Sequence, residues 1–170
     1  MNLKSNAFVL CLFTLIMMLT VGMTAYADSD GSGTGSLGKK IAGAYLVREG
    51  DDPTFLRLIT LTADGNWLST ESHQQSVEFG FSDQQGVWKK SGRREITANV
   101  IDFHIDPITG EPTGVARIRF VITFSKDFQG VSGEFFGKEF AFDQDPLDPN
   151  VILDDFGATL TGRRVTVQVD

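Results

Sequence analysis

The feature that most constrains this 170-residue chain is a ten-residue segment, 115–124, in which apolar and polar residues alternate. The even positions from Ala116 to Phe124 are all apolar, whereas the odd positions include Arg117, Arg119 and Thr123. A period of two is typical of a β-strand with one covered face and one solvated face. At about 3.3 Å per residue, the segment is long enough to form one wall of a small barrel.

Strand patterns separated by turn signals continue along the rest of the chain. Asp64-Gly65 is a strong hairpin signal, because this pair tolerates the positive φ angles of a tight turn. All five prolines fall between the proposed strands, and no segment shows the period of a convincing amphipathic helix. The pattern predicts eight strands, over residues 40–49, 54–62, 67–72, 85–90, 93–106, 115–124, 131–142 and 156–167.

Short connections between successive strands favour an antiparallel meander. Eight such strands most naturally close on themselves, so we predict an all-β protein with a single up-and-down β-barrel over residues 39–170. A two-sheet β-sandwich is the alternative architecture.

Strand 93–106 contains an irregularity in its apolar pattern. Its apolar residues occupy even positions up to Val100 and odd positions from Ile101 onward. A change of phase within one strand predicts a β-bulge or a sharp barrel corner near Val100. It would turn Asp102 and His104 toward solvent, which argues against catalysis or metal binding by this histidine.

The start of the chain predicts a secretory signal peptide, residues 1–27. Lys4 precedes an apolar run of roughly 15 residues, which is short of the ~20 needed to span a bilayer. Small residues at Ala25 and Ala27 predict cleavage after Ala27. The Gly/Ser/Asp-rich segment 28–38 is then expected to be a flexible linker. We therefore expect a secreted or periplasmic protein with no membrane span after cleavage.

Charge and cysteine content exclude several classes of function for the mature chain. Cys11 is the only cysteine and lies in the predicted signal peptide, so disulfides, thiol nucleophiles and Cys-ligated zinc are excluded. The formal net charge is −7 for the full chain and becomes −8 when Lys4 is lost with the signal peptide, and no basic patch is present, which argues against nucleic acid as a partner. No sequence motif indicates a cofactor.

The acidic and histidine residues of the chain do not match known metal-site patterns. Asp143, Asp145 and Asp148 lie in one loop, but the EF-hand spacing is not met and two prolines interrupt it. His73 and His104 do not share an HxH or HExxH spacing. We predict a solvated acidic loop and no metal site.

The chain is rich in phenylalanine, with 14 residues in all. These side chains are expected mainly in the core, but they also suit an apolar cavity or an oligomer face. If the apolar face of 115–124 points inward, it lines the barrel. The candidate ligand-lining residues are Tyr45, Ile118, Phe120, Ile122, Phe124, Phe136 and Phe140.

Two motifs lie in the first and last predicted strands, Gly43-Ala44-Tyr45 and Thr161-Gly162-Arg163-Arg164. They resemble motifs of calycin or lipocalin-like barrels, including secreted bacterial members of that superfamily. The resemblance covers about 39–167. It implies that an aromatic residue of the first strand packs under an arginine of the last, and that the barrel holds a small apolar ligand. Allene-oxide-cyclase-like barrels, which are cyclising enzymes, are a more distant resemblance.

The pairing of Tyr45 with Arg163 or Arg164 has two interpretations. A guanidinium stacked on an aromatic ring would close one end of the barrel together with Gly43, contributing about 0.5–2 kcal/mol. Alternatively, the arginine would anchor a ligand. The orientation of Arg117 and Arg119, toward lumen or solvent, is left open by the pattern.

Three functions are consistent with these observations. The favoured one is a secreted or periplasmic barrel that binds a small apolar molecule. The second is a barrel isomerase or cyclase, with Tyr45 or Glu134 supplying acid/base help. The third is a non-enzymatic interaction or assembly protein. The absence of a catalytic motif favours a protein that is not an enzyme.

Overall fold

The computed structural model describes residues 35–76 and 80–167. The predicted signal peptide and residues 28–34 of the predicted linker lie outside the described residues. The first element is a short helix, α2 (Gly35–Ile41), so the end of the predicted linker belongs to the folded domain. The sequence pattern does not predict this helix, because seven residues are too few to show a helical period. Its buried side chains, Leu37 and Ile41, hold it against the barrel.

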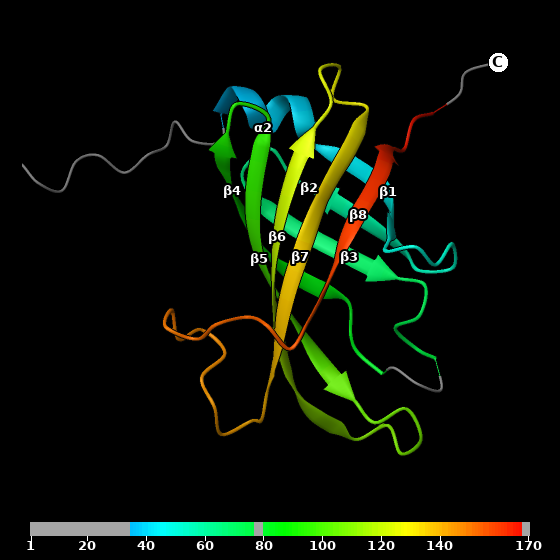
Figure 1. The fold of residues 1–170 in the computed structure, drawn as a ribbon, viewed down its shortest axis with the longest axis vertical. Coiled ribbons are helices and arrows are strands. Elements are labelled where there is room, and N and C mark those ends of the chain that lie inside the picture. The colour runs from blue at the N-terminus through cyan, green and yellow to red at the C-terminus, as the bar shows by residue number, and fades with distance from the viewer. Residues whose placement is uncertain (1–34, 77–79, 168–170) are drawn as a thin grey trace, which may run out of the picture. The chain divides into compact units, whose positions relative to one another are not determined.

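Eight antiparallel strands close into one barrel in the order β1 to β8, which confirms the predicted architecture (Figure 1). Each strand pairs with its neighbours in the sequence, and β1 pairs with β8 to complete the ring. Within the described ranges, no helix is long and apolar enough to cross a membrane. The strands are β1 (Gly43–Glu49), β2 (Leu56–Leu61), β3 (Asn66–Glu71), β4 (Gln84–Gly92), β5 (Glu95–Ile105), β6 (Pro112–Phe124), β7 (Gly130–Phe140) and β8 (Phe156–Arg164).

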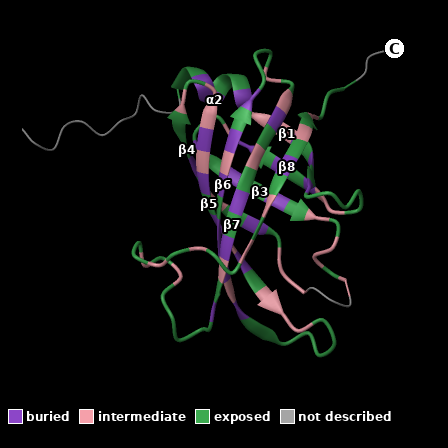
Figure 2. Cartoon of the chain, in the orientation of Figure 1, coloured by how far each residue is buried: buried purple, intermediate pink, exposed green. Residues whose placement is uncertain are grey.

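Burial alternates along most of each strand, as Figure 2 shows. In β6, the even positions from Ala116 to Phe124 are buried inside the barrel, as the alternation predicts. The core is filled by large aromatic side chains. Phe120 lies at its centre, with its ring centroid 4.7 Å from that of Trp67 and 5.3 Å from that of Phe135.

The predicted change of phase near Val100, by a bulge or a sharp corner, is wrong. Pairing between β5 and β6 runs without a break from Glu95 to His104, and the register shifts only after His104. Asp102 is therefore buried inside the barrel, whereas Phe103 is 55% exposed on the outside. The prediction failed because it assumed that every apolar residue of the strand points into the barrel. In this strand the inward positions near the end of the barrel are polar, and the outward ones are apolar.

One end of the barrel is closed by α2 and by contacts between the first and last strands. The Arg164 guanidinium lies 5.7 Å from the centre of the Tyr45 ring and donates hydrogen bonds to the carbonyl oxygens of Lys40 and Ala42. The Tyr45 hydroxyl donates to the Ile41 carbonyl oxygen at 3.0 Å. Gly43 has φ of 143°, and a Cβ atom there would lie 2.9 Å from Nη2 of Arg164. A glycine is needed here because the backbone is left-handed and the arginine is close.

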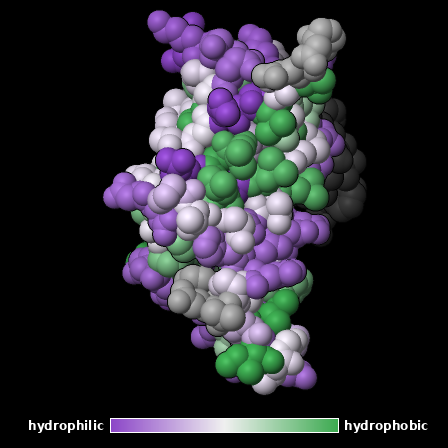
Figure 3. All heavy atoms as spheres, turned by 90° about the vertical axis from the view of Figure 1, so that its right-hand side faces the viewer, coloured by the Kyte–Doolittle hydropathy of each residue, from purple (hydrophilic) through white to green (hydrophobic). Residues whose placement is uncertain are grey.

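The outer face of the barrel also carries apolar side chains, as Figure 3 shows on the side that it displays. Leu46 on β1 and Leu58 on β2 stand opposite each other in the register and are 41% and 39% exposed. Other exposed apolar residues on neighbouring strands are Leu68 and Val87.

Candidate functional site

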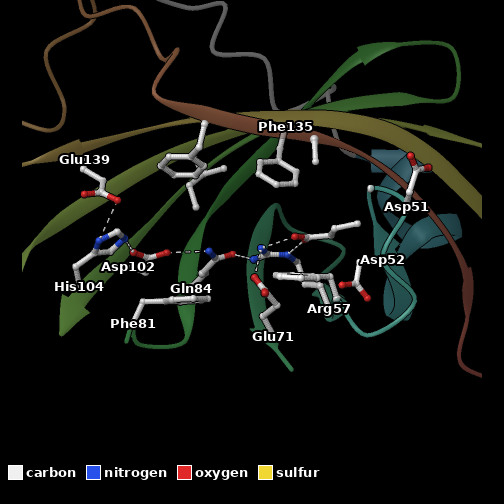
Figure 4. A pocket seen from close by; sticks show the side chains of 16 residues that line it. Asp51, Asp52, Arg57, Glu71, Phe81, Gln84, Asp102, His104, Phe135 and Glu139 are labelled. Atoms are coloured by element: carbon white, nitrogen blue, oxygen red, sulfur yellow. Dashed lines mark hydrogen bonds and ion pairs between the residues drawn. The ribbon is translucent and has the colours of Figure 1, made fainter. Parts of the chain in front are cut away.

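A pocket of about 450 Å³ opens at the end of the barrel opposite α2. Figure 4 shows the side chains that line it. The pocket is formed where strands β1, β3 and β5 end and where β2, β4 and β8 begin, together with inward-facing residues of β6 and β7 and the loop between β1 and β2. Its lining residues are Glu49, Gly50, Asp51, Asp52, Phe55, Arg57, Glu71, Phe81, Gln84, Asp102, His104, Ile118, Phe135, Glu139, Phe156 and Ala158.

Arg57, at the start of β2, forms the centre of a buried polar network at the inner end of the pocket. It points inward because it is in phase with Ile59 and Leu61. Its Nη2 donates to Glu71 Oε2 at 2.8 Å, and its Nε donates to Glu49. Its guanidinium carbon also lies 5.3 Å from the centre of the Phe120 ring. The guanidinium is thus neutralised by two carboxylates and packed against an aromatic ring.

Gln84, the first residue of β4, links this network to Asp102. Its Oε1 accepts hydrogen bonds from Arg57 Nη1 and, at 2.9 Å, from Ser69 Oγ. Its Nε2 donates to Asp102 Oδ2 at 2.8 Å. Since both ends of the amide are occupied, the orientation of Gln84 is fixed, and one oxygen of Asp102 is held with it.

The other oxygen of Asp102 has no hydrogen-bond partner in the described structure. Asp102 is 2% exposed, and its Oδ1 is buried without a hydrogen bond. The nearest charged partner is His104, whose Nε2 lies 3.5 Å away. Nδ1 of the same ring lies 3.4 Å from Glu139 Oε1 at the pocket mouth. Figure 4 shows Glu139, His104, Asp102, Gln84 and Arg57 in one row along the pocket.

Apolar and aromatic side chains form the remaining walls. Ile118 and Phe135 come from β6 and β7, and Phe156 and Ala158 come from β8. Gly137 makes room for Phe156, since a Cβ atom at Gly137 would lie 2.1 Å from the Phe156 ring. The pocket therefore combines apolar walls with polar groups along one side.

Burial perturbs two carboxyl groups of the pocket. Desolvation raises the pKa of Asp102, although the hydrogen bond from Gln84 and the charges of His104 and Arg57 oppose this. Desolvation also raises the pKa of Glu71, against the attraction of Arg57. Ionisation of each carboxyl group therefore lowers the stability of the folded protein.

The raised pKa of Asp102 predicts a pH-dependent effect of Asp102→Asn. The folded state holds this proton more tightly than the unfolded chain does. The penalty of the ionised carboxylate is therefore complete above the folded pKa, and it disappears as the pH falls below the ordinary value of 3.8. We expect Asp102→Asn to increase the free energy of unfolding by about 1 kcal/mol at pH 8, with a smaller gain at pH 4.

Urea unfolding at the two pH values measures this gain. Asp154→Asn, at an exposed loop position, is the matched control and should change stability by less than about 0.5 kcal/mol. A loss of stability in Asp102→Asn at pH 8 would contradict the assignment of a costly buried charge.

The predicted lining residues occupy different parts of the molecule. Ile118 lines the pocket, and Phe120, Ile122 and Phe124 are buried in the core beyond it. Tyr45 is at the closed end with Arg164, while Arg163 is exposed. Phe136 is 41% exposed on the outer face.

Phe140 and the arginines of β6 belong to the outside of the barrel. Phe140 is buried, with the Arg117 guanidinium carbon 5.7 Å from its ring centre. Arg117 also donates to the carbonyl oxygens of Asp148 and Val151, at 2.8 and 3.1 Å. Arg119 is exposed next to Asn99. Arg117 thus anchors the acidic loop after β7, and neither arginine points into the lumen.

The residues proposed for acid/base help are not in the pocket. Glu134 is exposed on β7, and the Tyr45 hydroxyl is bound to the Ile41 carbonyl at the closed end. Among residues 35–76 and 80–167, no group of three or more His, Cys, Asp or Glu side chains is arranged to hold a metal ion.

The sequence interpretation missed Arg57, Glu71 and Gln84, and it placed Asp102 and His104 on the wrong face. A usable signal was present, because Arg57 and Asp102 continue the buried alternation of their strands at its end. The chain matches no protein-family model, and comparisons with curated proteins and with solved structures found no match.

Proposed function

We propose that this protein binds a small, largely apolar molecule in the open end of its barrel. The observation that carries the proposal is the pocket of about 450 Å³, whose walls include Ile118, Phe135, Phe156 and Ala158. Ligand sites are typically cavities of about 300–1,000 Å³ with apolar walls and a few fixed polar groups. The hydrogen-bonded row from Arg57 to Asp102 would supply such groups. The resemblance to lipocalin-like barrels supports the same function.

The pocket is also largely fixed in shape before any ligand enters. Arg57 and Gln84 are held by several hydrogen bonds, and Phe135 packs on the buried Phe120 ring. Side chains that are already ordered lose little conformational entropy on binding. This arrangement favours binding of a ligand of defined size.

A pocket-filling substitution tests the proposal with a neutral apolar fluorescent probe, N-phenyl-1-naphthylamine. Ala158→Phe places a ring in the pocket, so we expect probe affinity to fall at least about tenfold. Ala141→Phe is the matched control, because Ala141 is exposed just after β7, and it should bind like the wild type. Thermal unfolding checks that both variants are folded. The proposal would be overturned by equal probe affinity in all three proteins, or by no binding to the wild type.

We also propose that the chain is exported with loss of residues 1–27, on the strength of the apolar run and the Ala25-x-Ala27 pattern. The mass of the denatured protein purified from its own host tests this. A chain that begins at Asp28 is expected, and a mass that retains the first 27 residues would contradict it.

A second candidate function, a barrel isomerase or cyclase, is favoured by one observation. Asp102 is buried, and His104 Nε2 lies 3.5 Å from its Oδ1. The two residues could act as an acid/base pair in a pocket with apolar walls. To test this, a molecule that copurifies with the protein from its own host is incubated with the protein in D₂O. Proton transfer at a carbon atom of that molecule would introduce deuterium. Recovery of the ligand unlabelled and unchanged would rule against this candidate.

A further inference from the structure

We infer that the pocket selects an apolar molecule that carries a cationic amine, and that the amine is held by Oδ1 of Asp102. This inference rests on the proposed binding function and specifies the chemical class of the ligand. It is carried by the geometry of Asp102, by the charges that line the pocket and by the way in which Arg57 is engaged.

The first observation is the unused acceptor on Asp102. The carboxylate is 2% exposed and lines the pocket, and Gln84 holds its Oδ2 at 2.8 Å. Oδ1 accepts no hydrogen bond in the described structure. A buried acceptor without a partner costs roughly 1–3 kcal/mol, so a ligand that donates to it gains an interaction that the free protein lacks.

The second observation is an excess of negative charge around the pocket. Six carboxylic residues line it, and Arg57 is the only lysine or arginine among the described lining residues. A field of this sign attracts cations and repels anions. The six are Glu49, Asp51, Asp52, Glu71, Asp102 and Glu139.

The third observation is that Arg57 is engaged within the protein. Its Nε and Nη2 bond to Glu49 and Glu71, and its Nη1 bonds to Gln84. An anionic ligand would have to displace these buried carboxylates to reach the guanidinium. A ligand carboxylate or phosphate therefore finds no free cationic partner at Arg57, whereas an amine finds Asp102.

The aromatic residues around Asp102 suit the same ligand. The Phe81 ring lies 6.3 Å from the His104 ring, and both line the pocket with Phe135 and Phe156. Aromatic faces attract ammonium groups by about 0.5–2 kcal/mol, and they also cover the apolar part of a ligand. An amine on an apolar body matches both parts of the lining.

His104 is the internal competitor for this position. Its Nε2 is 3.5 Å from Asp102 Oδ1, longer than a hydrogen bond, and its side chain is 23% exposed. A ligand amine would place a full positive charge where the imidazole makes only a long contact. His104 would remain beside Glu139, at 3.4 Å, near the pocket mouth.

Three probes of matched shape test the inference by calorimetry at pH 8, namely 4-phenylbutylamine, 4-phenylbutan-1-ol and 4-phenylbutyrate. We expect the full chain to bind the amine at least tenfold more tightly than the alcohol, and the carboxylate most weakly. In Asp102→Asn the preference for the amine over the alcohol should fall below threefold. Asp154→Asn, outside the pocket, should preserve the wild-type order.

The outcomes separate this inference from the proposed function. If the wild type binds the alcohol as tightly as the amine, or binds the carboxylate best, selection of a cation is wrong while binding of apolar molecules stands. If the amine preference survives in Asp102→Asn, Asp102 is not the contact and the inference fails. If none of the three probes binds, the inference fails, and binding of N-phenyl-1-naphthylamine decides the proposed function. The wild-type series decides the charge preference even if the variant fails to fold.

Discussion

Arg57→Met is expected to destabilise the barrel by about 3–5 kcal/mol, because it leaves Glu49 and Glu71 buried without their counter-charge. The side chains of all three residues are less than a tenth exposed. Urea unfolding at pH 8 measures the change. Arg48→Met is the matched control, since Arg48 is exposed on the adjacent strand and its loss should cost less than about 0.5 kcal/mol.

A compensated variant separates loss of charge balance from loss of packing. The triple substitution of Arg57→Met with Glu49→Gln and Glu71→Gln removes the uncompensated carboxylates, so most of the lost stability should return. If the triple variant is as unstable as Arg57→Met alone, packing of the guanidinium on Phe120 and Phe135 dominates, and the electrostatic account of the network is wrong.

Phe120→Ala should also cost about 3–5 kcal/mol, because its fully buried ring packs against Trp67 and Phe135. Phe103→Ala is the matched control on the neighbouring strand. Its ring is 55% exposed, so the same truncation should cost about 1 kcal/mol or less.

This pair of variants also tests the phase of β5. A bulge near Val100 would turn Phe103 into the core and Asp102 outward, and Phe103→Ala would then be as costly as Phe120→Ala. Comparable losses in the two variants would contradict the unbroken pairing of β5 with β6.

The fold could be predicted from the sequence because its determinants are local. The alternation in 115–124, the Asp64-Gly65 turn and prolines kept out of strand interiors define the strands and their short connections. Pro112, predicted in a loop, is the first residue of β6. Eight sequential antiparallel strands leave few ways to avoid exposed edges other than closure. All eight expected strands occur, with ends shifted by a few residues.

The candidate site could not be predicted in the same way, because it depends on contacts between strands that are distant in the sequence. Arg57 and Gln84 meet across 27 positions, and Gln84 and Asp102 across 18. A polar residue in phase with buried positions, such as Arg57 or Asp102, signals an internal network only once the barrel brings its partners together. The apolar Ile101 and Phe103 then suggested the opposite orientation for β5.

The helix α2 could not be predicted either, because it is stabilised by contacts with other elements. Its seven residues have little intrinsic tendency to form a helix and include two glycines. Burial of Leu37 and Ile41, with hydrogen bonds from Tyr45 and Arg164 to its last turn and the residue after it, stabilises it in place. The two bonds from Arg164 join residues more than 120 positions apart, so they depend on β8 lying beside β1.

The two ends of the barrel differ because of what points inward there. At the end near α2, Trp67, Trp88 and Phe124 fill the interior. At the other end, the inward residues include Arg57, Gln84 and Asp102, which bond to one another and leave a space above them. Asp102 is predicted to lower stability and to contact the ligand, so its carboxylate is expected to serve binding rather than folding.

Native mass spectrometry of the protein purified from its own host tests most directly whether the open end of the barrel is a ligand site. We expect the wild type to carry a bound molecule small enough for a pocket of about 450 Å³, and Ala158→Phe to be recovered without it. A wild type that carries no such molecule, or an Ala158→Phe variant that carries it to the same extent, would show that the open end of the barrel is not a ligand site.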